Sequence, residues 1–222
     1  LEGMPVLART LSIFNPLPEV EEIVIAIEAE DILHCRLEVV DRYRFHKVRS
    51  IVPGGANRAL SVAAALGDLG DEIDTVAVHD GARPLFPAQL LAEGLRELER
   101  GGHDGIVFGV PVIDTIKECD PGSRLVTSTP ERDRLWAAQT PQVFHREVLE
   151  RGYALPAEKL KLATDDSSLV EQAGGRVKIV PGARENIKLT EPVDLMLAAD
   201  ILRRRGTEAG EGRRNRGEGG GI

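Results

Sequence analysis

The feature that most constrains the fold is a regular alternation of short apolar runs with segments of helical pattern. Strand-like runs occur at 22–28, 74–80 and 105–112. The intervening segments, 57–70 and 87–102, carry apolar residues near helical spacing and end at glycines. Because parallel strands need a crossover connection, this order predicts a mostly parallel sheet with helices on both faces. The expected class is therefore a Rossmann-like α/β fold.

The pattern changes after Pro111, where a polar, turn-rich segment of about 113–143 follows. It contains the strand-like stretches TIKEC and RLVTST, joined by DPG, and no helix of ordinary length fits it. We expect this segment to form a hairpin-like β-arm that projects from the sheet.

The rest of the chain completes one domain over residues 1–205. Its further elements are predicted as helices at about 145–155, 165–173 and 191–205 and a strand at 176–182. The tail, 206–222, is rich in glycine and charged residues, so we expect it to be disordered.

Composition excludes several classes of function. The 222 residues carry a net charge of −8, which argues against broad binding to nucleic acid or to an anionic membrane. No stretch approaches the ~20 apolar residues that span a bilayer, and no signal peptide is visible. The two cysteines have no metal-binding spacing. We expect a soluble cytoplasmic protein.

Two charged residues follow the second strand in the stretch TVAVHDGARPLF. Ligands of open α/β sheets bind beyond the carboxyl ends of the strands, where Asp80 and Arg83 should lie. Asp80 could hold a divalent cation, and Arg83 could offer a planar fork to a phosphate. The structural alternative is that Asp80 caps the turn and pairs with Arg83.

A second candidate is the stretch PGGANRALSV. Gly54 and Gly55 would let the backbone approach a ligand, while Arg58 and Ser61 lie one helical turn apart near a helix start. A simple turn with a helix N-cap explains the same residues.

Two later stretches are equally open to either interpretation. Thr164 is placed to cap a helix whose first turn holds Asp165 and Asp166. Lys188 lies between apolar residues, where a structural salt bridge competes with a role in phosphate binding.

Together these stretches resemble the family of 2-C-methyl-D-erythritol 4-phosphate cytidylyltransferases, from about residue 3 to residue 202. The matching stretches are, in order, GMPVLARTL, GGANRALSV, VAVHDGARPL, PVIDTIK, LWAAQTPQVF, TDDSSLVE and NIKLTEPVDLMLA. The resemblance implies a Mg²⁺-dependent enzyme that couples CTP to 2-C-methyl-D-erythritol 4-phosphate. The products would be a CDP-alcohol and pyrophosphate, on the non-mevalonate route to isoprenoids. It also implies a homodimer in which the arm reaches over the neighbouring subunit.

The resemblance also implies roles for individual residues. Asp80 would be the metal-binding acid and Lys188 the cation beside the reacting phosphates. The cytidine-binding loop would comprise Gly54, Gly55, Arg58 and Ser61. The pocket for the acceptor phosphate would comprise Arg83, Thr115, Arg132, Thr140 and Thr164. In the turn at residues 80–83, Asp80 would thus face the metal and Arg83 would face the acceptor substrate.

One departure from the family concerns the beginning of the chain. The family starts with a strand, a G-x-G-x-R loop and a lysine that wrap the triphosphate, and Leu1 lies just beyond that position. We therefore expect the sequence to be incomplete and inactive as it stands. Two alternatives stay open: a cytidylyltransferase for another polyol phosphate, such as ribitol 5-phosphate, or a non-catalytic nucleotide-binding protein.

Overall fold

The computed structural model describes residues 1–217, with the side chains of residues 1–206. The strands are β1 Ile23–Ile27, β2 Val48–Pro53, β3 Thr75–Val78, β4 Gly105–Pro111, β5 Glu118–Cys119, β6 Val126–Ser128, β7 Trp136–His145 and β8 Val177–Pro181. The helices are α1 Val6–Phe14, α2 Ile32–Cys35, α3 Arg58–Leu66, α4 Gln89–Glu99, α5 Arg146–Tyr153, α6 Ala157–Leu162, α7 Asp166–Gln172 and α8 Pro192–Gly217. All strands and helices expected from the hydrophobic pattern are present.

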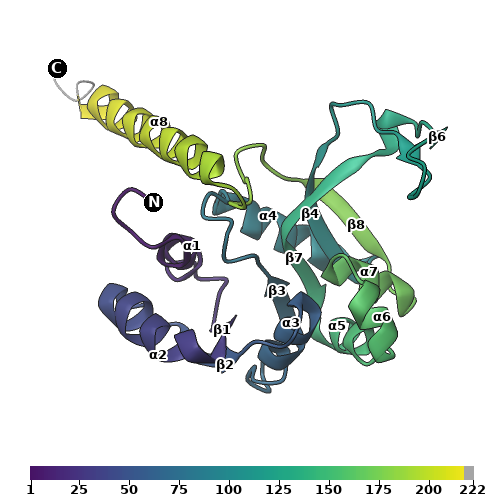
Figure 1. The fold of residues 1–222 in the computed structure, drawn as a ribbon. Helices are drawn as coiled ribbons and strands as arrows, with labels where there is room; N and C mark the ends of the chain where they lie inside the picture. Colours follow the sequence, from purple (N-terminus) through teal and green to yellow (C-terminus); the bar gives the residue numbers. More distant parts are fainter. Residues whose placement is uncertain (218–222) are drawn as a thin grey trace.

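The main sheet has four strands in the order β3-β7-β4-β8 (Figure 1). Strand β7 pairs antiparallel with β3 and with β4, whereas β4 and β8 pair in parallel. Thus β3, β4 and β8 run in one direction and β7 runs in the other. A second sheet, β1-β2, is parallel. The α/β class with mostly parallel strands is therefore confirmed.

Helices cover both faces of the main sheet because the residues of β7 alternate between two cores. Val143 packs with Ile106 of β4 and Leu91 of α4 on one face. On the other face, Phe144 packs with Leu149 of α5. Complete burial of side chains of this size stabilises the fold by about 2 kcal/mol each. These two layers fix the carboxyl end of β3, where the site lies.

The sheet is interrupted between β1 and β3. A cavity of about 470 Å³ separates the two strands, and its walls come mainly from α1, β1, α3 and β3. Its lining is mostly apolar, but it also includes Arg58, Ser61 and Asp80. The cavity therefore reaches the polar residues that follow β3.

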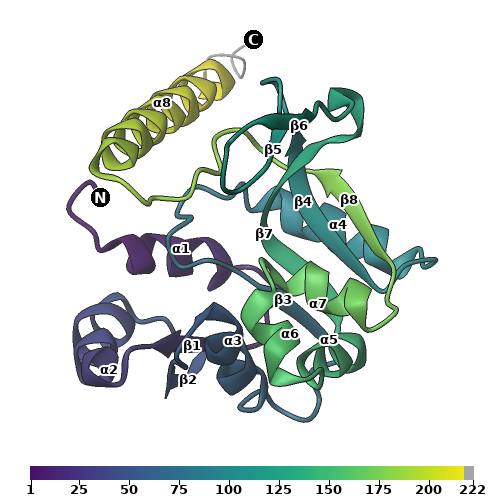
Figure 2. The same cartoon turned by 45° about the vertical axis from the view of Figure 1, so that its right-hand side comes forward.

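The arm is confirmed as an antiparallel pair, β5 and β6, that projects from the body (Figure 2). Its predicted extent, 113–143, was too long. Residues 136–143 belong to β7, which runs through the middle of the main sheet. The polar Gln139, Thr140 and Gln142 conceal this strand in the sequence, yet all three are buried and hydrogen-bonded.

Helix α8 extends further than the sequence predicted. It continues to Gly217 and leads away from the sheets (Figure 1). It therefore overlaps the tail predicted to be disordered, since Ala, Glu and Arg in 206–217 favour helix despite the glycines. The rest of that tail, 218–222, lies outside the described residues. Within the described part of the chain, no helix is long and apolar enough to cross a membrane.

Candidate active site

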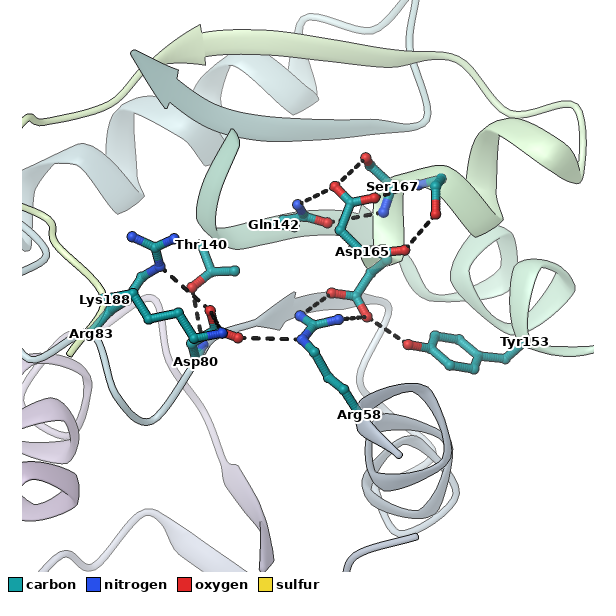
Figure 3. Close-up of polar contacts among 11 residues, drawn as sticks. Arg58, Asp80, Arg83, Thr140, Gln142, Tyr153, Asp165, Ser167 and Lys188 are labelled. Carbon is teal, nitrogen blue, oxygen red and sulfur yellow. Dashed lines mark hydrogen bonds and ion pairs between the residues drawn. The ribbon is translucent and has the colours of Figure 1, made fainter. Parts of the chain in front are cut away.

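Three cationic side chains converge on Asp80, directly after β3 (Figure 3). The Nζ atom of Lys188 lies 3.0 Å from Asp80 Oδ2. Arg58 Nε lies 3.3 Å from Oδ1, and Arg83 Nε lies 3.5 Å from Oδ2. The structure thus brings together four residues that the sequence singled out in three separate stretches. We call Arg58, Asp80, Arg83 and Lys188 the Asp80 cluster.

These cations determine the charge state of Asp80. Partial burial alone would raise the pKa of its carboxyl group. The hydrogen bond and charge of Lys188, with the charges of Arg58 and Arg83, outweigh burial and lower the pKa below its usual value. Burial lowers the pKa of Arg83, but an arginine stays charged near neutral pH. Asp80 is therefore an anion held among cations.

Strand β7 and the segment before α8 fix the position of Asp80. The backbone N–H of Asp80 donates to Thr140 Oγ1 at 3.0 Å. The side-chain amide of Asn186 donates to the Thr140 carbonyl at 2.9 Å, and Arg83 Nη1 donates to the Asn186 carbonyl at 2.7 Å. Thr140 thus supports the cluster. Asn186 is fully buried, and its part in the site was not recognised from the sequence.

His79 precedes Asp80 and contributes packing rather than charge. Its ring lies edge-on to Phe14, and its Nε2 atom is 3.0 Å from the Arg83 carbonyl oxygen. Burial lowers the pKa of His79 to about 4, so the imidazole is neutral at physiological pH. It holds the turn at the end of β3 without adding another cation.

The segment that contains Gly54 and Gly55, which we call the glycine loop, is shaped by its contacts with α3. The N–H of Gly55 donates to Ser61 Oγ at 3.1 Å, and a Cβ atom on Gly55 would lie 2.3 Å from Leu60 Cβ. The N–H of Gly54 donates to the Ile27 carbonyl at 2.7 Å. Asn57 is the N-cap and accepts from the N–H of Leu60. The turn and cap expected as the structural alternative are therefore present.

Arg58 is held by a second acid as well as by Asp80. Its Nη1 and Nη2 atoms donate to the two carboxylate oxygens of Asp166 at 3.1 and 2.6 Å. The sequence assigned Asp166 only a favourable place in a helix dipole. Thr164, the predicted cap of that helix, is exposed, and Asp165 takes the role by accepting from Ser168 N–H. Asp165 is preferred because it immediately precedes the first helical residue.

The arm residues lie apart from this cluster. Thr115 and Arg132 are both exposed. The Nη1 atom of Arg132 donates to the Ile113 carbonyl at 3.1 Å, within the arm itself. Among the described contacts, neither residue reaches Asp80. One chain therefore does not assemble the whole predicted pocket.

Comparison with known proteins identifies the family of this chain. A sequence profile of 2-C-methyl-D-erythritol 4-phosphate cytidylyltransferases matches residues 1–204. The chain belongs to this cytidylyltransferase family. It is therefore a nucleotidyltransferase of isoprenoid biosynthesis, as the sequence predicted.

Individual relatives agree with this assignment. The chain is 41% identical over 205 residues to the enzyme of that name from Geotalea uraniireducens, covering 91% of this chain and 86% of the relative. It is 43% identical over 204 residues to the one from Syntrophotalea carbinolica, covering 91% and 85%.

Solved structures show the same fold. The 4-diphosphocytidyl-2C-methyl-D-erythritol synthase of Anaerococcus prevotii has a TM-score of 0.78 at 28% identity, with 91% of this chain and 88% of that chain covered. The 2-C-methyl-D-erythritol 4-phosphate cytidylyltransferase of Thermus thermophilus gives 0.73 at 29% identity, with 90% of each chain covered.

The charges of the site suit the phosphates that a cytidylyltransferase handles. Arg58, Arg83 and Lys188 face Asp80 and Asp166, so these five side chains carry a surplus of one positive charge. Lys188 is 42% exposed and can contact a ligand while it stays near Asp80. The described residues contain no group of three or more potential metal-binding His, Cys, Asp or Glu side chains.

Proposed function

We propose that this chain joins CTP to 2-C-methyl-D-erythritol 4-phosphate and releases pyrophosphate, in the cytoplasm. The observation that carries the proposal is the convergence of Arg58, Arg83 and Lys188 on Asp80 at the end of a strand. A surplus of positive charge at this edge favours two phosphorylated substrates that would otherwise repel each other. The names of the relatives support this acceptor over ribitol 5-phosphate.

The reaction asks the protein for position and charge rather than for covalent chemistry. A phosphate oxygen of the acceptor attacks the α-phosphorus of CTP, and a new O–P bond forms. The bond from that phosphorus to the bridging oxygen breaks, and pyrophosphate leaves with the electron pair. Lys188 and Arg83 offset the negative charge of the approaching groups, and the rigid turn at Asp80 keeps them in register.

Asp80 is the residue that would hold Mg²⁺. Mg²⁺ commonly binds one or two carboxylates and takes its other ligands from substrate phosphates and water. One largely buried carboxylate at a strand end fits that pattern, although its oxygens now face Lys188, Arg58 and Arg83. When bound, Mg²⁺ would neutralise phosphate charge.

The glycine loop is proposed as the cytidine-binding side. Gly54 and Gly55 present backbone near Ser61, and Ser61 lines the cavity that reaches Asp80. The Ser61 hydroxyl already accepts from Gly55 and donates to the Asn57 carbonyl, so it fixes the loop. Arg58 is tied to two carboxylates, which favours a supporting role rather than direct recognition of the base.

The acceptor side is proposed to need a second copy of the chain. The polar residues Thr115 and Arg132 lie on the arm and are exposed, and the described hydrogen bond of Arg132 is to the Ile113 carbonyl rather than to the Asp80 cluster. Large apolar side chains on and next to the arm are also exposed, among them Leu125 at 71% and Trp136 at 40%. A homodimer would cover such side chains and bring the arm to the neighbouring site, with Thr164 beside it.

The test uses the complete product of the gene that encodes this chain. Pyrophosphate release is followed with CTP and 2-C-methyl-D-erythritol 4-phosphate in the presence of Mg²⁺. Parallel reactions lack the acceptor, contain EDTA, or contain ribitol 5-phosphate instead. Release that requires the methylerythritol substrate and Mg²⁺ supports the proposal. Equal release with ribitol 5-phosphate, or none with either acceptor, contradicts it.

A further inference from the structure

A completely buried carboxylate lies behind the Asp80 cluster. Asp166, the first residue of α7, has 0% exposure. It accepts hydrogen bonds from Nη1 and Nη2 of Arg58 and, at 2.5 Å, from the Tyr153 hydroxyl. A buried charge costs several kcal/mol unless it is paired and hydrogen-bonded, so this geometry is maintained strongly. The three side chains come from α3, α5 and α7.

Arg58 connects this buried carboxylate to the carboxylate of Asp80. Two of its nitrogens face Asp166, and the third, Nε, donates to Asp80 Oδ1 at 3.3 Å (Figure 3). The guanidinium group is planar and rigid, so a fork fixed by Asp166 also fixes where Nε points. The orientation of Arg58 relative to Asp80 is therefore determined from behind.

Tyr153 restricts Asp166 in turn. Burial, followed by the neighbouring Asp166 charge, raises the pKa of Tyr153 well above its usual value, so the phenol stays protonated and donates. For Arg58, burial alone would lower the pKa, but the hydrogen bond and charge of Asp166 raise it overall. Every contact in this series of hydrogen bonds thus joins one donor to one acceptor, from Tyr153 through Asp166 and Arg58 to Asp80.

We infer that Asp166 and Tyr153 are positioning residues for nucleotidyl transfer, because they hold Arg58 in the orientation that places Asp80. The inference rests on the proposed function of the Asp80 cluster. Asp166 is completely buried, and both residues are assigned an action through Arg58 rather than a contact with substrate. The rival explanation is that they only join α3, α5 and α7 mechanically, in which case their loss would lower stability and leave catalysis in the folded protein unchanged.

The test compares kinetics with stability in four variants of the complete protein. Tyr153→Phe removes one hydroxyl and Asp166→Asn removes the charge. Matched controls are Tyr43→Phe, which stacks on Phe45, and Asp68→Asn, which is hydrogen-bonded to Ser50. We expect kcat to fall about three- to tenfold in Tyr153→Phe and further in Asp166→Asn, with the KM for CTP nearly unchanged and both controls at wild-type kcat.

A double-mutant cycle separates positioning from mechanical support. In an Arg58→Lys background, Tyr153→Phe should cause no further loss of kcat, because the residue through which it acts is gone. Wild-type kcat in folded Tyr153→Phe, or losses that simply add in the Arg58→Lys background, would overturn the inference. Tyr153→Phe decides the question even if Asp166→Asn fails to fold. An inactive wild-type protein would instead count against the proposed function.

Discussion

The Asp80 cluster and the arm carry the two halves of the same predicted site, but they are built in opposite ways. In the cluster, every charged group has a partner from a distant part of the chain, and Arg58 contacts a residue 108 positions away. On the arm, Thr115 and Arg132 are exposed, and the hydrogen bond of Arg132 stays within the arm. One half is therefore preorganised by the fold, while the other depends on what the arm meets.

This difference indicates a division of labour between the two regions. Groups that manage charge during bond transfer gain most from a fixed position, because they need no reorganisation at the moment of reaction. Groups that select a substrate tolerate mobility and can be supplied by a neighbouring subunit. Mutations in the cluster should therefore affect kcat, whereas mutations on the arm should weaken the apparent affinity for one substrate.

The largest effect is expected for Asp80→Asn. Removal of the anion leaves Arg58, Arg83 and Lys188 without their common partner, and it removes the carboxylate that we propose as the Mg²⁺ ligand. We expect kcat to fall by at least about a hundredfold, the scale of losing a preorganised electrostatic group. Asp114→Asn, an exposed acid beside the arm, is the matched control. Wild-type turnover in Asp80→Asn, measured by pyrophosphate release, would refute the assignment.

A smaller and more selective effect is expected for Arg132→Ala. Loss of a charge-assisted contact with the acceptor phosphate should raise the KM for the methylerythritol phosphate substrate by about tenfold or more. The KM for CTP should change little. Arg134→Ala, two residues away in the same short helical turn and also exposed, serves as control. Equal increases in KM for both substrates would remove the distinction between the two regions.

Mixing the two variants tests whether the halves come from different subunits. In a heterodimer of Asp80→Asn and Arg132→Ala, one site would combine an intact Asp80 with an intact Arg132. At an acceptor concentration well below the KM of Arg132→Ala, random mixing should then give about a quarter of wild-type activity, since half of the dimers are hybrid and one of their two sites is whole. No recovery after verified subunit exchange would place both halves in one chain.

The smallest effect is expected at the start of helix α8, in the segment that follows Lys188. The Asp194 carboxylate accepts from the N–H groups of Thr190 and Glu191, and these bonds lower its pKa. A lowered pKa means that the stabilisation is complete above about pH 3.9 and is lost as the pH falls further. The melting temperature of Asp194→Asn should thus be slightly lower than wild type at pH 7, and the difference should shrink as the pH falls below about 3.9. A difference that persists at low pH would contradict this account.

Much of the fold followed from the sequence because its strands are apolar and its helices are periodic. Residues 105–109 of GIVFGVPV are all buried, as the lack of charge in this stretch predicts. Strand β7 escaped notice because WAAQTPQVFH includes two glutamines, a threonine and a proline. Those polar groups are satisfied by Ala183, Asp165 and the backbone of Asp80, which no local pattern reveals. The prediction of disorder from residue 206 onward missed the continuation of α8. The reason is different here, because amino-acid composition does not fix where a helix ends.

The site was predictable where residues follow strand ends and not where they are brought together by tertiary contacts. Asp80 and Arg83 could be located by the rule that ligands bind beyond the carboxyl ends of strands. Asp166 and Tyr153 could not, because a helix-capping segment and an amphipathic helix explain them adequately by themselves. Their only signal is burial of charge, which becomes visible when α3, α5 and α7 are packed together.

The interruption of the sheet between β1 and β3 has a consequence for cooperativity. No strand pairing joins β1-β2 to β3-β7-β4-β8 among the described residues, and a cavity lies between them. Two parts of a protein that few hydrogen bonds connect can unfold locally with different free energies. In a protein of these 222 residues alone, amide hydrogens of β1 and β2 should therefore exchange with solvent through a local opening while those of β4 and β7 stay protected. Ser61 and Arg58 sit on α3, which contacts β1, so such an opening would disturb the nucleotide side before the main sheet unfolds.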